Sequence, residues 1–176
     1  MIKFALSILF FILIAPSLAI AEGSANGKLP PEYEMAINEL KSAKSIECYF
    51  PLGSFANWKG KSMKLEEDRF SNAIHFDNID SSGKGRARLI GNMGATDVLV
   101  FASPTGITFI EQTEIGNFIY TTVFPSYLGD KKINSEPQKK TFLFHKAYIA
   151  VTSRHGYHPL TGAMPSQFHG YCRILE

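Results

Sequence analysis

Two hydrophobic periodicities divide the chain. Apolar residues recur at intervals of three and four over residues 31–44, which predicts an amphipathic helix with one buried face. Pro30 and Pro31 suit the start of this helix, because the first turn makes no use of the N–H group that proline lacks. From residue 46 the pattern changes to an alternation of apolar and polar residues, which is typical of β-strands. The chain is therefore predicted to form one N-terminal helix followed by a β domain.

The clearest strands lie in the middle of the chain. Four strand-like runs cover residues 84–90, 95–102, 107–112 and 117–124. The short breaks between them contain glycine, which tolerates the positive φ angles of tight turns. Breaks this short join neighbouring antiparallel strands, so the four runs are predicted to form a meander.

Further strands are expected on both sides of this meander. They cover residues 46–50, 58–65, 72–79, 140–153 and 168–175, while residues 125–138 form a polar connection. About nine strands at this spacing predict an all-β, mainly antiparallel fold, in which a meander of eight or nine strands closes into a barrel or a tight sandwich. Several strands are apolar on both faces, so either both faces are covered or the strands curl around an apolar interior. Side chains are expected to fill that interior, as in most small barrels, and a ligand cavity is the alternative.

The N-terminal residues have the pattern of an export signal. A basic start is followed by an apolar run over residues 4–15, and Ala19 and Ala21 fit the small-x-small cleavage pattern. We predict a Sec-type signal peptide over residues 1–21 with cleavage after Ala21. Residues 22–29 then form a flexible lead, and residues 30–176 form a single β domain. The expected location is the periplasm or the outside of the cell.

The net charge gives no sign of a polyanionic partner. Removing Lys3 with the signal peptide leaves 17 of the 18 basic residues against 16 acidic residues, a net charge of +1. A balance this close to neutrality gives no long-range field to attract nucleic acid or an anionic membrane. We expect neither a nucleic-acid partner nor a membrane span after signal cleavage. The oligomeric state is open.

The two cysteines are expected to form a disulfide, because thiols of exported chains are usually oxidised. Cys48 lies in the first predicted strand and Cys172 in the last. A disulfide requires their Cα atoms to approach within about 7 Å. The first and last strands should therefore be neighbours or face each other, which favours a closed barrel or a tight sandwich.

The predicted outline is similar to that of lipocalin-like and other calycin barrels. The shared features are a helix, eight or nine antiparallel strands, and a disulfide to the C-terminal strand. The single tryptophan, Trp58, follows Ala56 and Asn57 and so lacks the Gly-x-Trp setting of the lipocalins. The resemblance is one of shape, and a shared shape implies no function.

Candidate chemistry gathers between residues 154 and 169. Arg154 ends an apolar strand and is followed by His155, Tyr157 and His158, a cation and rings that suit the rim of a binding cleft. These four residues are the candidate ligand-binding set, and a small apolar ligand or an envelope protein would meet the molecule here. The alternative is that Arg154 pairs with a loop carbonyl or an acidic neighbour and has no binding role.

A second interpretation makes the histidines metal ligands. His155, His158 and His169 together with a water molecule would resemble a catalytic zinc site with three protein ligands. Gly156 and Pro159 disfavour the helix that would place the rings of His155 and His158 on one side. The segment from residue 153 to 175 also contains no Asp or Glu to orient the rings. No cofactor is predicted, and zinc is the one candidate kept open.

Two functions remain in competition. The first is a non-enzymatic binding or interaction module for a small ligand or an envelope partner. The alternative is a metal-dependent or histidine-based hydrolase that uses the 154–169 loop. The chain lacks a Gly-x-Ser-x-Gly elbow, and oxidised cysteines cannot act as nucleophiles. The sequence therefore favours binding and names no catalytic residue.

Overall fold

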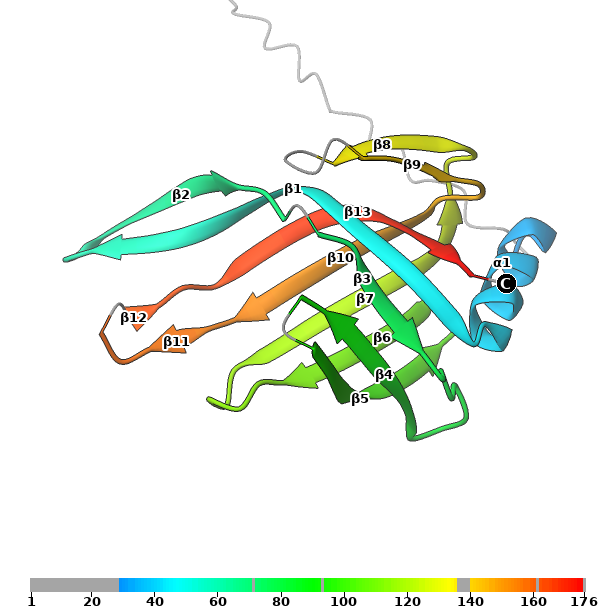
Figure 1. Ribbon diagram of the computed structural model, residues 1–176, viewed down its shortest axis with the longest axis horizontal. Coiled ribbons are helices and arrows are strands. Elements are labelled where there is room, and N and C mark those ends of the chain that lie inside the picture. Colours follow the sequence, from blue (N-terminus) through cyan, green and yellow to red (C-terminus); the bar gives the residue numbers. More distant parts are fainter. Residues whose placement is uncertain (1–28, 71, 93, 136–139, 161, 176) are drawn as a thin grey trace, which may run out of the picture.

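The computed structural model describes residues 29–175 except residues 71, 93, 136–139 and 161. The predicted signal peptide and nearly all of the predicted lead lie outside these residues. Within them the chain forms one helix and thirteen strands (Figure 1). The helix is α1 (Pro31–Ser42), which confirms the predicted helix. No helix of the described part has the length and hydropathy of a membrane span.

The strands follow one another along the chain with short connections. The first seven are β1 (Ser45–Lys59), β2 (Ser62–Asp68), β3 (Ile74–Asp77), β4 (Gly85–Gly91), β5 (Gly94–Ser103), β6 (Gly106–Gln112) and β7 (Phe118–Tyr127). The others are β8 (Lys131–Ser135), β9 (Lys140–Phe144), β10 (Tyr148–His155), β11 (Tyr157–His158), β12 (Gly162–Ala163) and β13 (Ser166–Ile174). Strands β4 to β7 are the predicted central meander.

Eight strands close into an antiparallel barrel. The order around it is β1, β3, β4, β5, β6, β7, β10 and β13, and β13 pairs with β1 to complete the circle. The ninth strand of this sheet, β2, pairs with the far half of β1. The structure thus confirms an all-β fold with one helix and selects the barrel over the sandwich.

A disulfide joins the first strand of the barrel to the last. Cys48 and Cys172 lie directly opposite each other in the β1–β13 ladder, with their Cα atoms 4.0 Å apart. The bond confirms the predicted pairing and spans 124 residues of chain. In the chain-entropy account a loop of this length stabilises the fold by about 4–5 kcal/mol.

The first strand is longer than predicted. We expected separate strands over residues 46–50 and 58–65, but β1 runs unbroken through Pro51 and turns back only at Gly60. The register with β13 shifts between Tyr49 and Leu52, so Pro51 falls in an irregularity of the ladder. Proline is tolerated at such a bulge because no ladder hydrogen bond is needed from its nitrogen.

The predicted strand over residues 140–153 is in fact two strands. Lys146, with a φ of 49°, lies in the turn that separates β9 from β10. Strand β10 belongs to the barrel, whereas β9 pairs with β8 in a separate hairpin. The buried Phe144 and Ala147 pack with Tyr49 outside the main core. Tyr148 and Ala150, by contrast, belong to the main core, so this segment contributes to two apolar clusters.

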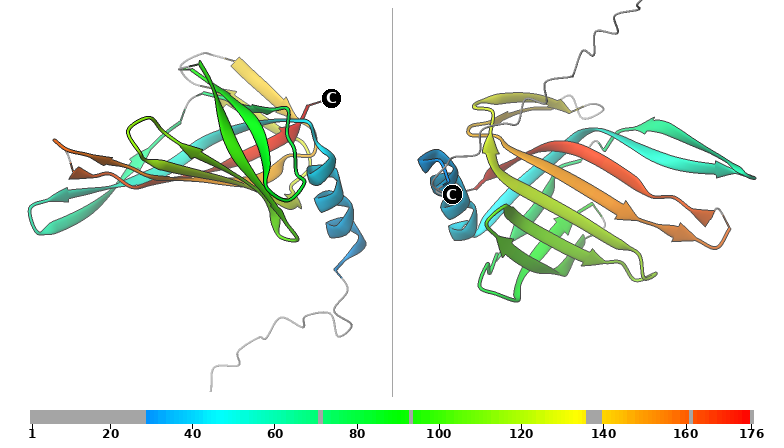
Figure 2. Two further views of the ribbon diagram at one scale, coloured as in Figure 1. Left: turned by 90° about the horizontal axis from the view of Figure 1, so that it is seen from below. Right: turned by 180° about the vertical axis from the view of Figure 1, so that it is seen from behind.

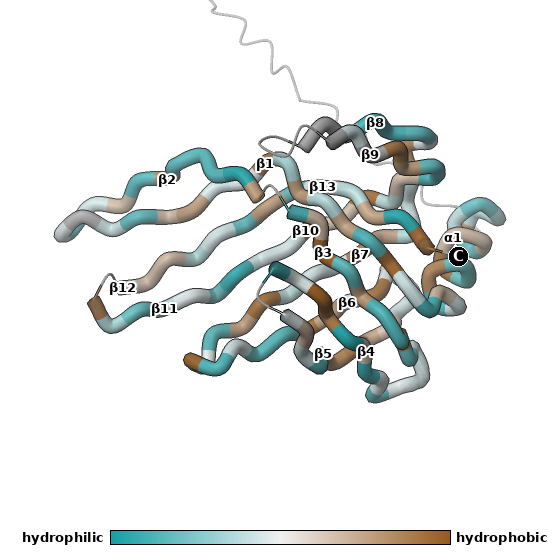
Figure 3. Tube along the Cα trace, viewed as in Figure 1, coloured by the Kyte–Doolittle hydropathy of each residue, from teal (hydrophilic) through white to brown (hydrophobic). Residues whose placement is uncertain are grey.

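Helix α1 covers one end of the barrel (Figures 1 and 2). Its buried residues Ala36 and Leu40 join the main core, in which the Phe76 and Phe109 rings stack at 3.8 Å. Inward-facing side chains fill the interior at this end. Figure 3 shows the alternation of apolar and polar positions along the barrel strands that produces this core.

The end opposite the helix is open and flared. The β1–β2 hairpin and the ends of β10 and β13 extend beyond the barrel, with β11 and β12 at their tip (Figures 1 and 2). Here the sheet has a concave inner face that continues the barrel interior and a convex outer face. The predicted 154–169 segment lies at this flared end.

Candidate functional site

Strand alternation separates Arg154 from the residues that follow it. Along β10, Thr152 and Arg154 lie on the face that lines the barrel, while Ser153 and His155 lie on the outer face. The buried Thr152 hydroxyl accepts a hydrogen bond from the Thr121 hydroxyl across the ladder. Arg154 occupies the next inward position, toward the open end.

The ladder places Arg154 in the middle of an inward-facing row that crosses six strands. The row runs Glu111, Ile119, Arg154, Ser166, Phe55 and Glu66, each residue directly opposite the next. Side chains opposite each other in an antiparallel sheet share a face. The concave face therefore has a cation at its centre, apolar and hydroxyl neighbours, and a carboxylate at each margin.

The rings of Phe70 and Phe168 lie next to each other, 6.1 Å apart between their centres, and both contact the guanidinium of Arg154. Its Cζ atom lies 4.6 Å from the centre of the Phe70 ring and 5.1 Å from the centre of the Phe168 ring. Phe168 is fully buried on β13, whereas Phe70 is carried by the segment between β2 and β3. Such cation–π contacts stabilise a partly desolvated guanidinium.

The Nε atom of Arg154 is buried and finds no hydrogen-bond partner among the described residues. Burial lowers the pKa of this guanidinium, and the carboxylates of Glu111 and Asp68 oppose that shift. Arginine nevertheless stays protonated at any physiological pH. A buried donor without a partner costs about 1–3 kcal/mol, so the fold holds this group at a cost that an incoming acceptor would remove.

Glu111 is the nearest inward carboxylate along the row. Burial raises the pKa of Glu111, and the attraction of Arg154 opposes this effect. The two residues are separated by one strand, which sets their backbones roughly 10 Å apart. We call Arg154, Glu111, Asp68, Phe70 and Phe168 the Arg154 cluster.

The Arg154 cluster has the chemistry of a recognition site for an anionic oxygen group. One edge of a guanidinium, formed by Nε and one Nη, binds a carboxylate or phosphoryl group through two parallel hydrogen bonds. The rings of Phe70 and Phe168 offer an apolar wall beside it. When it is ionised, the neighbouring Glu111 carboxylate would repel an anion and so weaken the binding of that anion at Arg154.

The other predicted ligand-binding residues lie apart from this cluster. His155 is on the outer face, where its ring lies 5.2 Å from that of Tyr120. Tyr157 and His158 are exposed in the short β11–β12 hairpin at the tip. The Nδ1 atom of His158 accepts a hydrogen bond from the Leu160 N–H. The structure thus brings none of these three side chains to Arg154.

The three predicted metal ligands lie on three different strands: His155 on β10, His158 on β11 and His169 on β13. His169 lies opposite Val151, four residues before His155 along β10. This spacing separates His155 from His169 by about 13 Å along the strands. Within the described residues no group of three His, Cys, Asp or Glu side chains is placed to hold a metal ion.

A second buried charge cluster lies on the outer face of the barrel. The side chain of Glu47 is 6% exposed and accepts hydrogen bonds from Arg173 at 2.6 Å, with His75 Nε2 at 3.2 Å. Arg173 also donates to the Leu143 carbonyl oxygen at 3.1 Å. This cluster connects β1, β3 and β13 to the β8–β9 hairpin, and its groups satisfy one another. Its role is structural.

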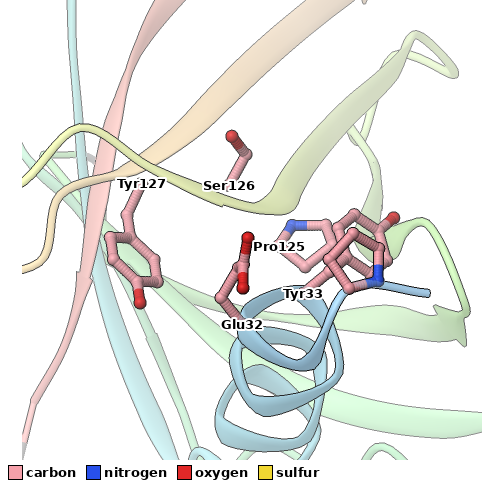
Figure 4. Close-up of a pocket in the computed structure, with 6 residues that line it drawn as sticks. Glu32, Tyr33, Pro125, Ser126 and Tyr127 are labelled. Carbon is pink, nitrogen blue, oxygen red and sulfur yellow. The ribbon is translucent and has the colours of Figure 1, made fainter.

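A pocket of about 250 Å³ lies beside the start of helix α1 (Figure 4). Its lining comes from the helix and from the end of β7, namely Pro30, Glu32, Tyr33, Pro125, Ser126 and Tyr127. The Tyr33 hydroxyl donates to the Pro104 carbonyl oxygen, which fixes the ring in the wall. The pocket is open to solvent and holds no buried, unpaired polar group comparable to Arg154 among the described residues.

Sequence reasoning found Arg154 but missed its surroundings. Ile107, Phe109 and Glu111 share one strand face by period two, so a carboxylate on an apolar face was visible in the sequence. Phe70 and Phe168 come from segments far apart in the chain, and only barrel closure brings them to Arg154.

Comparisons of the chain with protein-family models, with curated proteins and with solved structures give no match. The function must therefore be argued from the Arg154 cluster and the fold that positions it.

Proposed function

We propose that this protein is an exported, non-enzymatic binding protein whose ligand combines an apolar body with one anionic oxygen group. The Arg154 cluster at the flared end of the barrel receives that ligand. The observation that carries the proposal is the Arg154 guanidinium, which lies against two phenylalanine rings and whose buried Nε has no partner among the described residues. Carboxylate and phosphoryl groups share the chemistry that this cation recognises.

The surroundings of Arg154 support a ligand with an apolar part. Ile119 and Phe55 lie in the same inward row, two positions that would contact an aliphatic or aromatic body. Phe70 belongs to the segment between β2 and β3 rather than to a strand. Its ring can therefore move aside to admit an acceptor oxygen to the Nε edge without disturbing the barrel ladder.

Two observations support export. The Cys48–Cys172 disulfide is of the kind that forms and persists in oxidising compartments. The N-terminal residues have the pattern of a cleaved signal peptide. Both agree with a binding protein that works in the periplasm or outside the cell.

Matched probes test the role of the charge directly. Sodium octanoate and octan-1-ol share an alkyl chain and differ in the anionic group, so calorimetric titration of both isolates the contribution of Arg154. We expect octanoate to bind roughly tenfold or more tightly than octan-1-ol, since a charge-assisted hydrogen bond contributes about 1.5–3 kcal/mol. Arg154→Met keeps an apolar side chain beside the two rings, and it should reduce the affinity for octanoate to that for octan-1-ol.

Arg86→Met is the control, because Arg86 is exposed on the outer face of β4. It removes the same charge from the molecule and should leave octanoate binding unchanged. Equal binding of octanoate and octan-1-ol by the unmodified protein would contradict the proposal. So would an equal loss of octanoate binding in both variants, because that result assigns the effect to net charge.

A further inference from the structure

Strand β2 has a free edge. It pairs with β1 on one side, and no strand of the described part pairs with its other side. In Figure 1 the β1–β2 hairpin extends away from the barrel, so this edge is accessible to another molecule. Alternate residues of an antiparallel edge strand direct their N–H and C=O groups outward, where a further strand can pair with them.

The side chains of β2 alternate between its two faces. Met63, Leu65 and Glu67 lie on the outer face, and Lys64 and Glu66 lie on the inner face. Charged residues on an edge strand usually discourage pairing with other chains. Here the charges are self-complementary: when two β2 strands run antiparallel, Lys64 of one copy can lie opposite Glu66 of the other.

Only some registers align the faces of two antiparallel β2 strands. With Leu65 opposite its own copy, Lys64 of each copy lies opposite Glu66 of the other. The two adjacent registers that keep the faces aligned place Lys64 opposite Lys64, or Glu66 opposite Glu66. Opposite charges across a strand pair are stabilising and like charges are destabilising, so the first register is favoured.

The outer face beside this edge is apolar and exposed. Leu52, Trp58, Met63 and Leu65 have exposed fractions between 45% and 65%. Trp58 lies opposite Met63 in the β1–β2 ladder, so their side chains share this face. A two-fold axis through the pair of Leu65 residues would bring these two apolar side chains together on the outer face and place each Met63 opposite Glu67 of the other copy.

We propose that two copies of this chain pair through their β2 strands, antiparallel and with Leu65 on the two-fold axis. The interface is isologous: each copy supplies the same strand, two Lys64–Glu66 cross-strand pairs form on the inner face, and the two Leu65 side chains meet on the outer face. This pairing uses the free edge of β2, which is separated from β10 and Arg154 by β1 and β13.

Charge reversal with rescue tests this register. Sedimentation equilibrium of the purified protein and of three variants, Lys64→Glu, Glu66→Lys and the double variant, measures the dimer dissociation constant. Each single reversal places like charges opposite each other twice, and we expect it to weaken dimerisation about tenfold or more. The double variant restores both opposite-charge pairs and should return the dissociation constant close to that of the unmodified protein.

The variants change only exposed or half-exposed side chains. Each variant, measured as a monomer, should therefore unfold at the same temperature as the unmodified monomer. A protein that remains monomeric at the highest concentration measured would overturn the proposal. Dimerisation that is unaffected by either single reversal would also overturn it, because the interface would then lie elsewhere. Loss in the single variants without recovery in the double variant would exclude the proposed register.

Discussion

At the scale of the residue, the surroundings of a side chain depend on the face of the strand to which it points more than on its neighbours in the sequence. Arg154 and His155 are adjacent, yet the first lines the barrel and the second contacts Tyr120 on the outside. The sequence grouped Arg154 with His155 in one predicted binding rim, and the structure places their side chains on opposite faces because β10 continues one residue past Arg154. Alternation along an ordered strand sends the two side chains to opposite faces.

Glu111 should make the stability of the protein depend on pH. Its pKa is raised in the folded protein by burial, so the folded state binds its proton more tightly than the unfolded state does. The contribution of Glu111 is therefore fully present below its ordinary pKa of 4.5 and is lost as pH rises through the folded pKa. Glu111→Gln should gain stability relative to the unmodified protein between pH 4 and pH 7.

Urea unfolding at these two pH values measures the difference. Glu114→Gln is the matched control, since Glu114 is exposed in the turn between β6 and β7, and it should show no such change. A Glu111→Gln variant that loses relative stability as the pH rises would contradict the assignment. The same variant should bind octanoate more tightly at neutral pH, because it removes a carboxylate close to Arg154.

At the scale of the element, the local sequence pattern predicted which elements form better than it predicted where each strand ends. The helix and the central meander follow from their periodicity and from glycine in the turns, and both are present as predicted. The division of residues 140–153 between β9 and β10 depends on a turn at Lys146 that no glycine or proline marks. The unbroken course of β1 depends on a bulge at Pro51, which is possible because its partner β13 shifts register there.

Helix α1 is held to the barrel by a charged contact that should fail in acid. Tyr148 Oη and Lys146 Nζ donate hydrogen bonds to Glu39. The bond from Tyr148, and then that from Lys146, lowers the pKa of Glu39 below its ordinary value of 4.5. Glu39 therefore adds stability that is present above that value and is lost as pH falls through the lowered pKa.

Glu39→Gln should remove this dependence. Thermal unfolding followed between pH 3 and pH 6 should show a smaller loss of stability on acidification in the variant than in the unmodified protein. Glu34→Gln is a suitable control, because Glu34 is exposed on the same helix and has no contact of this kind among the described residues. An equal acid dependence in all three proteins would show that the Glu39 contact contributes nothing.

At the scale of the whole molecule, one covalent constraint predicted the topology. Requiring Cys48 to meet Cys172 brought the first and last strands together, and the structure closes the barrel at those two residues. The flared end could not be predicted in the same way. It depends on how far β1, β2, β10 and β13 extend past the point of closure, and this length is set by pairing between distant segments.

The same closure builds the Arg154 cluster. Its members come from β6, β10, β13 and the region around the end of β2, and only the closed barrel brings them together. The barrel end sealed by α1 is a filled core, while the opposite end holds a cation under two rings. This asymmetry is the physical basis for assigning binding to the flared end.

The central claim is that the Nε edge of Arg154 receives the anionic group of a ligand. The most direct measurement is the ¹H–¹⁵N side-chain resonance of Arg154 Nε during titration with octanoate, assigned by its loss in Arg154→Met. The resonance should move and saturate with the affinity found by calorimetry, and octan-1-ol should leave it nearly unchanged. An Nε resonance that stays in place while octanoate saturates its site would contradict the claim.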